Sequence, residues 1–298
     1  MVGAPKCGTT AMFTYLQAHP EIAFSSTKEP HYFGHDHRRI NHQPRTEAQY
    51  LDLFAGAKNE RWVGDASTSY LHSSTAAEEI RAFSSDPKMV IMLREPVDVM
   101  YALHGTVLAD GFEFIEDFPK ALEVEEARQR GQHLPRIRPG LLENLLYRET
   151  VRYHSQVKRY LDVFGSRVHI ILYDDFAADT PGVHRKLLEF LEIDPSFQPR
   201  FEVVNASARP RSTKFNNFLW NPPRPLQAAV QSILPAEFRT KLVNKLKGLN
   251  VKKQARPPLE AAFRAQLNSE LAGEMDRLGS LIGRDLSHWC GRKNANSR

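Results

Sequence analysis

Short apolar runs alternate along the chain with longer stretches in which apolar residues recur every three or four positions. The run at residues 89–93 is uninterrupted and the one at 168–172 contains a single polar residue, His169; both predict parallel strands buried in a sheet. Shorter runs at 21–24 and 62–64, and a stub at 2–3, predict further strands. Strands of this kind, separated by helical stretches, favour an α/β protein.

The stretches between the strands carry the three-to-four spacing of amphipathic helices. Residues 10–18 predict a helix that ends at His19-Pro20, because the residue before proline is pushed out of the helical region. Thr180-Pro181 predicts the start of a second helix, with Thr180 as its cap and the proline at its first position. The apolar residues expected to face the core are Phe13, Leu16, Leu187, Leu188 and Leu191.

A third helix is predicted over residues 258–282, near the end of the chain. Its apolar positions follow one another at steps of four and three: Phe263, Leu267, Leu271, Met275 and Leu278. We therefore expect a three-layer α/β fold, with a central, mostly parallel sheet flanked by helices. We expect one domain over residues 1–298, in which 1–200 form the core and 201–298 an irregular segment and a helix packed on it. Residues 128–140, rich in charge, Gly and Pro, predict a mobile loop.

Composition narrows the choice of partners. The 298 residues are 41% hydrophobic and 25% charged, as in ordinary soluble globular proteins. The net charge of +5 suits anionic ligands or simply a basic surface, and no basic run is long enough to indicate nucleic acid. Cys7 and Cys290 provide neither a disulfide framework nor a metal motif. The sequence shows neither a signal peptide nor an apolar run of about 18 residues, so we expect a cytoplasmic protein without a membrane span.

The first ten residues resemble a phosphate-binding loop whose lysine has moved. Gly3 and Gly8 keep the spacing of the two glycines in a triphosphatase P-loop, but Thr9 stands where that loop has its lysine. The lysine of this chain is Lys6, inside the loop. Backbone N–H groups at the start of a helix bind an anion whatever the nucleotide is. The new position of the lysine therefore affects where the positive charge points and whether a metal ion is needed.

The strand predicted at 89–93 ends in Arg94. A triphosphatase commonly has an aspartate near such a strand end to help hold magnesium, whereas a guanidinium is a planar fork suited to a phosphate monoester. Ligands of open α/β sheets bind at the carboxyl ends of the strands, where Arg94 would lie. The alternative is a surface ion pair of Arg94 with Glu95 or Asp98.

These motifs, in this order, resemble the sulfotransferases that use 3′-phosphoadenosine 5′-phosphosulfate (PAPS), in particular the bacterial and heparan-sulfate branch. The resemblance is specific from residue 2 to about 191 and vaguer beyond. The matching stretches are Pro5-Lys6-Cys7-Gly8-Thr9-Thr10, Lys28-Glu29-Pro30-His31-Tyr32-Phe33, Gly64-Asp65-Ala66-Ser67-Thr68-Ser69-Tyr70, Leu93-Arg94-Glu95-Pro96-Val97-Asp98 and Leu172-Tyr173-Asp174-Asp175-Phe176.

The resemblance implies how the donor is bound. It puts Lys6 beside the oxygen that bridges the 5′-phosphate and the sulfonate, where negative charge grows as the bond breaks. Backbone amides from Cys7 through Gly8 to Thr10, with the hydroxyls of Thr9 and Thr10, would hold the 5′-phosphate. Arg94 would bind the 3′-phosphate. The serine usual eight residues later is here Ala102, so another donor, such as Arg211, would have to replace it. The product would be adenosine 3′,5′-bisphosphate.

The resemblance also implies an acceptor side. Glu29 is the candidate general base, if partial burial raises its pKa toward neutrality. His31 as the base and a structural role for Glu29 are the alternatives. The residues expected to contact the acceptor are Lys28, His31, Tyr32, Asp65, Ser67, Tyr70 and His104, the last of which could equally be a packed side chain. His35-Asp36-His37 lacks a third ligand with a supporting motif, so no metal site is expected.

The function expected is transfer of a sulfonate from PAPS to a hydroxyl, less readily an amine, of a carbohydrate or small metabolite. A P-loop kinase and a catalytically silent nucleotide-binding relative are the alternatives. Basic residues after position 127 would suit an anionic saccharide or a solvated lid: Arg128, Arg130, His133, Arg136 and Arg138. No heptad or exposed apolar stripe indicates the oligomeric state.

Overall fold

The computed structural model describes residues 1–37, 43–134, 142–202, 208–210, 218, 251–253 and 256–292. The chain divides into two compact units. The first contains Met1–Met100, Arg148–Val204 and Leu259–Arg298, and the second Tyr101–Tyr147 and Asn205–Pro258. That all 298 residues form one domain stays a prediction.

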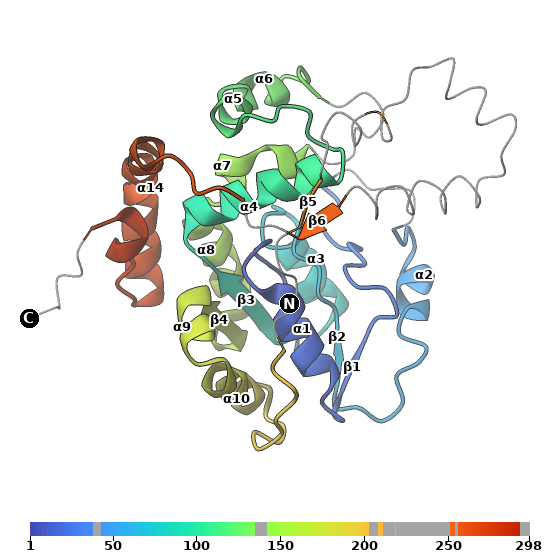
Figure 1. The fold of residues 1–298 in the computed structure, drawn as a ribbon. Helices are drawn as coiled ribbons and strands as arrows, with labels where there is room; N and C mark the ends of the chain where they lie inside the picture. The colour runs from blue at the N-terminus through green and yellow to red at the C-terminus, as the bar shows by residue number, and fades with distance from the viewer. Residues whose placement is uncertain are drawn as a thin grey trace, which may run out of the picture. The chain divides into compact units, whose positions relative to one another are not determined.

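Parallel strands form the centre of the first unit (Figure 1). Strand β1 (Ile22–Phe24) pairs with β2 (Trp62–Gly64), and β3 (Met89–Leu93) with β4 (Val168–Leu172). The N-terminal segment lies beside β3, since the amides of Val2 and Ala4 donate to carbonyls of β3 at 3.0 and 2.7 Å. The predicted strands are therefore confirmed.

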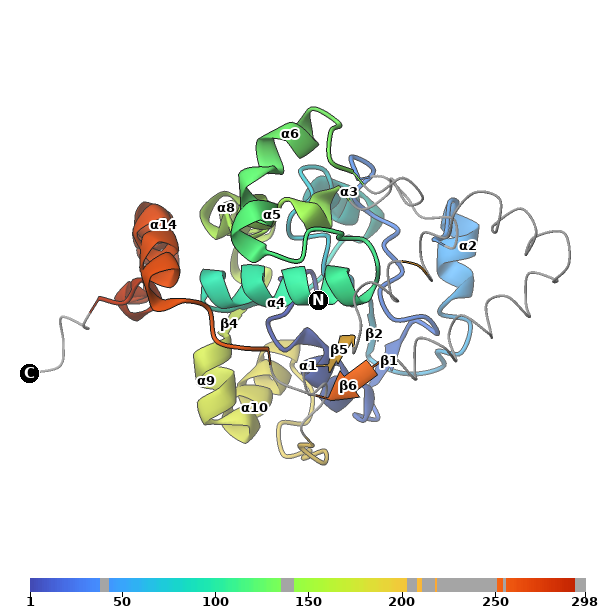
Figure 2. The ribbon, with the colours of Figure 1, turned by 45° about the horizontal axis from the view of Figure 1, so that its top comes forward.

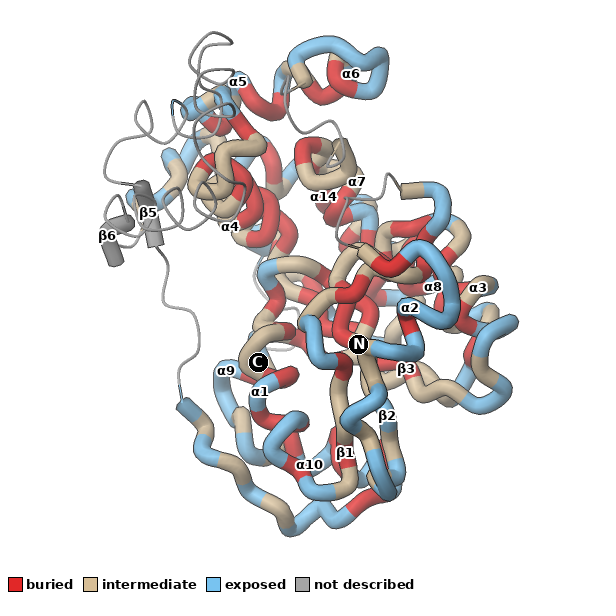
Figure 3. The backbone as a smooth tube through the Cα atoms, turned by 90° about the vertical axis from the view of Figure 1, so that its right-hand side faces the viewer, coloured by how far each residue is buried: buried red, intermediate tan, exposed pale blue. Residues whose placement is uncertain are grey.

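Helices flank these strands. Helix α8 packs on both β3 and β4, α3 and α14 pack on α8, and α1 packs on β1. Helices α9 and α10 pack on β4 (Figure 2). Their bounds are α1 (Thr9–Gln17), α2 (Glu47–Asp52), α3 (Ala76–Phe83), α8 (Tyr153–Phe164), α9 (Tyr173–Ala178), α10 (Thr180–Leu191) and α14 (Ala261–Ile282). Strand β3 is buried along its whole length (Figure 3), because helices and neighbouring strands cover it. The predicted α/β fold is confirmed.

The predicted helices are present, with one correction. The cap of α10 is Asp179, whose carboxylate accepts from the amide of Gly182 at 2.9 Å, and not Thr180, which is already helical. The predicted inward residues Phe13, Leu16, Leu187, Leu188 and Leu191 are buried, as are Leu267, Leu271, Met275 and Leu278 of α14, while Phe263 is only partly covered.

Helix α4 (Pro96–Ala109) continues from the first unit into the second, and α7 (Tyr147–Thr150) leads back. The second unit also contains α5 (Phe118–Glu123), α6 (Glu125–Gln129) and an antiparallel pair, β5 (Ala208–Pro210) with β6 (Val251–Lys253). Along the described parts of the chain, no helix has the length and apolar character needed to cross a membrane.

The prediction of a mobile loop over residues 128–140 is wrong at its first residue, Arg128. Arg128 belongs to α6 and its side chain is fully buried, in an ion pair with Glu113 at 2.7 Å. Tyr147 donates to the same carboxylate at 2.7 Å. A buried charge is costly unless paired and hydrogen-bonded, so this triad is a fixed part of the second unit and Arg128 cannot contact a saccharide. Arg136 and Arg138 lie outside the described residues.

Candidate functional site

The glycine-flanked loop leads directly into α1. A Cβ on Gly3 would come within 2.7 Å of Leu71 Cβ and 2.9 Å of the Thr68 carbonyl oxygen, so only glycine fits there. Gly8 has φ of 87° and immediately precedes α1, where no side chain caps the helix. The first amide groups of a helix have no partner inside it, so these N–H groups can bind an anion.

The side chains of the loop divide into inward and outward ones. Lys6 is exposed, with a left-handed φ of 64°. Cys7 is fully buried, and that burial raises the pKa of its thiol to about 12, so the thiol stays protonated at neutral pH. Thr9 is buried and Thr10 partly so. Lys6 is thus the cation that the loop presents outward.

Arg94 follows β3 and is held from two sides. Its guanidinium carbon lies 4.6 Å from the ring centre of Tyr173, and Nη2 donates to Asp98 Oδ2 at 2.8 Å. Arg264 of α14 also donates to Asp98, at 2.6 Å, and to Glu95, at 3.2 Å. Burial would raise the pKa of Asp98, but the hydrogen bonds from Arg264 and Arg94 lower it. The ion pair considered as an alternative for Arg94 is therefore present.

Two residues for which we predicted no role, Tyr173 and Thr68, link these parts of the first unit. The ring of Tyr173 would be 3.3 Å from a Cβ on Gly8 and also stacks on Arg94. The carbonyl of Thr68 lies against Gly3, and its hydroxyl donates to Glu29 Oε2 at 3.1 Å. The structure therefore brings the loop, Arg94 and Glu29 together. Both residues lie inside matched motifs, but only three-dimensional contacts reveal what they join.

Glu29 is surrounded by donors. Lys28 Nζ lies 2.6 Å from Oε1, and His31 Nε2 lies 3.2 Å from Oε2. The other ring nitrogen of His31 is 2.6 Å from the Ser69 hydroxyl, which fixes the ring. Glu29 and His31 have left-handed φ values of 59° and 50°, an uncommon conformation that is found more often at functional sites.

The electrostatics of Glu29 contradict the expected rise in its pKa. Burial alone would raise it, but the hydrogen bond from His31 and the charge and hydrogen bond of Lys28 outweigh burial and lower the pKa to about 2. The carboxylate is thus ionised throughout the neutral range. Ionisation lets it accept a proton or hydrogen bond, but so low a pKa makes it a weak base.

Asp65, Ser67 and Tyr70 form a hydrogen-bonded network beneath the acceptor-side segment. Ser67 and Tyr70 donate to Asp65 at 2.7 and 2.8 Å, and their hydroxyls accept from the amides of His31 and Tyr32 at 3.0 and 2.8 Å. The ring of Tyr32 stacks on Tyr50, with centroids 4.4 Å apart. Because Ser67 and Tyr70 are buried, the geometry assigns these oxygens to holding the segment in place.

The remaining predicted residues lie elsewhere. Ala102 is in α4, where its carbonyl accepts from Thr106 at 3.1 Å. His104 is fully buried in the second unit, between the carbonyl of Ile115 at 2.9 Å and Arg256 at 2.6 Å, and burial lowers its pKa to about 4. It is a packed side chain. Arg211 lies outside the described residues.

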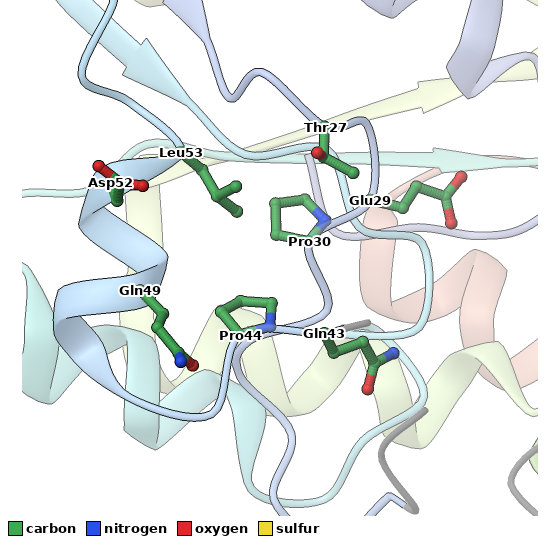
Figure 4. Close-up of a pocket in the computed structure, with 8 residues that line it drawn as sticks. All are labelled: Thr27, Glu29, Pro30, Gln43, Pro44, Gln49, Asp52 and Leu53. Atoms are coloured by element: carbon green, nitrogen blue, oxygen red, sulfur yellow. The ribbon is translucent and has the colours of Figure 1, made fainter. Parts of the chain in front are cut away.

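A pocket of about 350 Å³ opens beside Glu29 (Figure 4). Two carboxylates, two amides, a hydroxyl and three apolar side chains line it: Glu29, Asp52, Gln43, Gln49, Thr27, Pro30, Pro44 and Leu53. Near it in sequence, His35 contacts the carboxylate of Glu79, and Asp36 accepts a hydrogen bond from the Ser73 hydroxyl. In the described residues no three His, Cys, Asp or Glu side chains are grouped so as to hold a metal ion.

The amino-acid sequence of this chain is similar to those of known sulfotransferases. Carbohydrate sulfotransferase 15 of Mus musculus is 24% identical over 299 residues, which cover 83% of this chain and 52% of that protein. Heparan sulfate glucosamine 3-O-sulfotransferase 3B1 of Mus musculus is 28% identical over 97 residues, 33% of this chain and 23% of that protein. The chain therefore spans about half the length, or less, of these curated relatives.

A solved structure extends the similarity to the whole fold. The crystal structure of a sulfotransferase from Alicyclobacillus acidocaldarius superposes with a TM-score of 0.72 at 30% identity, over 97% of this chain and 96% of that one. The model of the sulfotransferase domain family matches residues 1–222. With three quarters of its length matched and its fold shared, the chain belongs to the sulfotransferase family.

Proposed function

We propose that this protein transfers the sulfonate of PAPS to a hydroxyl, less readily an amine, of a carbohydrate acceptor. The family implies PAPS as the donor, and the carbohydrate and heparan sulfate sulfotransferases among its relatives suggest a saccharide acceptor. The observation that carries the proposal is the convergence on one unit of the uncapped loop, Arg94 and Glu29, through Tyr173 and Thr68.

The donor fits the groups that are present. Amides at the start of α1 and the hydroxyls of Thr9 and Thr10 would bind the 5′-phosphate, and Arg94 would bind the 3′-phosphate with a planar fork. Lys6 would stabilise the charge that grows on the bridging oxygen as the sulfur–oxygen bond breaks. Adenosine 3′,5′-bisphosphate would leave. Because the transferred group carries less negative charge than a phosphoryl group, we expect no requirement for a divalent metal.

Glu29 would accept the proton of the acceptor hydroxyl. Its two oxygens offer about four lone-pair positions, and Lys28, His31 and Thr68 occupy three, which leaves one for the acceptor. The depressed pKa favours a second candidate, His31, which is in contact with Glu29 and held by Ser69. Lys28, with its ammonium 5.8 Å from the ring centre of Phe13 in α1, would help to hold the carboxylate.

The test is transfer of ³⁵S from labelled PAPS to a panel of oligosaccharides, with and without a metal chelator. We expect labelled product in both conditions, whereas labelling that needs added magnesium would overturn the metal-free part. Glu29→Gln should lower turnover by at least about 100-fold, and His31→Asn by less. The reverse order would make His31 the base. Magnesium-dependent binding of ATP, without binding of adenosine 3′,5′-bisphosphate, would support the kinase alternative, which the family match does not favour.

A further inference from the structure

The pocket beside Glu29 has an unusual balance of charge for a protein with a net charge of +5. Its lining within the described residues includes no lysine, arginine or histidine. The charge of Glu29 is offset by the ammonium of Lys28, and His31 also contacts its carboxylate. The carboxylate of Asp52, on the opposite side of the pocket in Figure 4, has no hydrogen-bond or ion-pair partner where the structure describes the chain.

From this lining we propose that the pocket is an acceptor subsite selective for uncharged, hydroxyl-rich groups, and that Asp52 excludes anionic ones. The inference rests on the proposed sulfonate transfer and specifies its substrate class. The occupant would be the part of the acceptor next to the reacting hydroxyl, because the pocket begins at Glu29.

The polar groups suit hydroxyls. The Asp52 carboxylate can accept hydrogen bonds from two hydroxyl groups, while the Gln49 amide, whose oxygen already accepts from the Arg45 amide at 2.8 Å, has its NH₂ group left to donate. Pro30 and Leu53 provide an apolar surface for the C–H face of a sugar ring. The volume of about 350 Å³ lies at the lower end of the range for small-ligand sites.

The same groups disfavour an anion. A sulfate or carboxylate in the pocket would lie near Asp52, and the described lining residues offer no cation to compensate. Because the Asp52 side chain is exposed, water screens the repulsion and keeps it modest. Asp52 is also the last residue of α2, where the helix dipole disfavours a negative charge. The negative charge of Asp52 therefore does not stabilise α2, so we expect the Asp52→Asn variant to fold.

The experiment uses a matched pair of acceptors on the full chain. One is an oligosaccharide of alternating uronic acid and N-acetylhexosamine, and the other is the same oligosaccharide with each carboxyl group reduced to an alcohol. We expect kcat/KM with labelled PAPS to be several-fold higher for the reduced acceptor. Asp52→Asn should raise kcat/KM for the anionic acceptor several-fold and lower it for the neutral one.

Two controls locate the effect. Glu47→Gln removes a carboxylate from the same helix but not from the pocket, and should leave the preference unchanged. Replacing both Arg38 and Arg39 by Ala should also leave it unchanged. A wild-type preference for the anionic acceptor that Asp52→Asn does not alter would overturn the inference while leaving sulfonate transfer intact. If neither acceptor is labelled, calorimetry measures the binding of each acceptor to the protein loaded with adenosine 3′,5′-bisphosphate. Binding of the neutral acceptor alone would support the inference and show that the proposed sulfonate transfer is the part that fails. Any other binding pattern would overturn the inference.

Discussion

The proposed donor side and the proposed acceptor side hold their charges in different ways. On the donor side, Lys6 comes shortly before α1 and Arg94 follows β3, and the carboxylate of Asp98 accepts from both Arg94 and Arg264. On the acceptor side, Lys28 and His31 contact the carboxylate of Glu29, while the carboxylate of Asp52 has no partner among the described residues. The contrast supports the proposal of a fixed anion site next to an acceptor site that loops can vary.

The largest expected effect tests the donor side at the point of bond breaking. Lys6→Ala should lower kcat about 100- to 1,000-fold, because it removes the cation that we propose to lie beside the departing oxygen. It should change the affinity for adenosine 3′,5′-bisphosphate much less. Initial rates with labelled PAPS and calorimetry with the product nucleotide measure the two effects. Lys158→Ala, at an exposed ion pair of α8, is the matched control. If kcat is maintained, Lys6 is not the group that stabilises the leaving nucleotide.

The sequence predicted the strand that positions Arg94 better than it predicted the electrostatics of Glu29, for a physical reason. Residues 89–93 are buried on both faces, so their apolar run marks the strand, and Arg94 follows it directly. The pKa of Glu29 depends instead on where Lys28 and His31 point, which no spacing reveals. Arg128 was placed in a loop because its neighbours in sequence are polar, while its actual partner, Glu113, lies fifteen residues away.

Long-range contacts also explain what the sequence missed. Thr68 and Tyr173 lie within recognisable motifs, yet each acts by touching two segments far from it in the chain. Arg264 reaches Asp98 across 166 residues. On a helix identified only by its apolar face, a polar position such as 264 carries no signal of its own.

The second prediction separates the two arginines of the donor side. Arg94→Ala should weaken binding of adenosine 3′,5′-bisphosphate about 100-fold but barely change that of adenosine 5′-monophosphate, because only the 3′-phosphate uses this site. Arg264→Ala should weaken binding of the bisphosphate about ten-fold, since Asp98 and Glu95 would then repel it with one cation fewer beside them.

Calorimetry with both nucleotides gives these ratios directly. Arg277→Ala, on the exposed side of the same α14 helix, controls for damage to that helix. A loss for Arg264→Ala that is equal for the two nucleotides would show that Arg264 only holds α14 against Glu95 and Asp98 within the first unit.

The smallest expected effect concerns pH and the acceptor side. The pKa of Glu29 is lowered from 4.5 to about 2 in the folded protein, so its ionised form stabilises the fold above pH 4.5 and this contribution is lost as the pH falls toward 2. Glu29→Gln should therefore reduce the free energy of unfolding by about 1–2 kcal/mol at pH 7, a figure kept small because the side chain is 29% exposed. Urea unfolding between pH 8 and 4 should show a constant difference in unfolding free energy between the variant and the wild type down to about pH 5, and a smaller difference below.

Glu126→Gln, at a carboxylate that is 87% exposed, is the control and should show no such difference. A difference that grows on acidification would mean that Lys28 and His31 do not keep Glu29 ionised. The contrast in charge between the acceptor side and the donor side would then no longer hold.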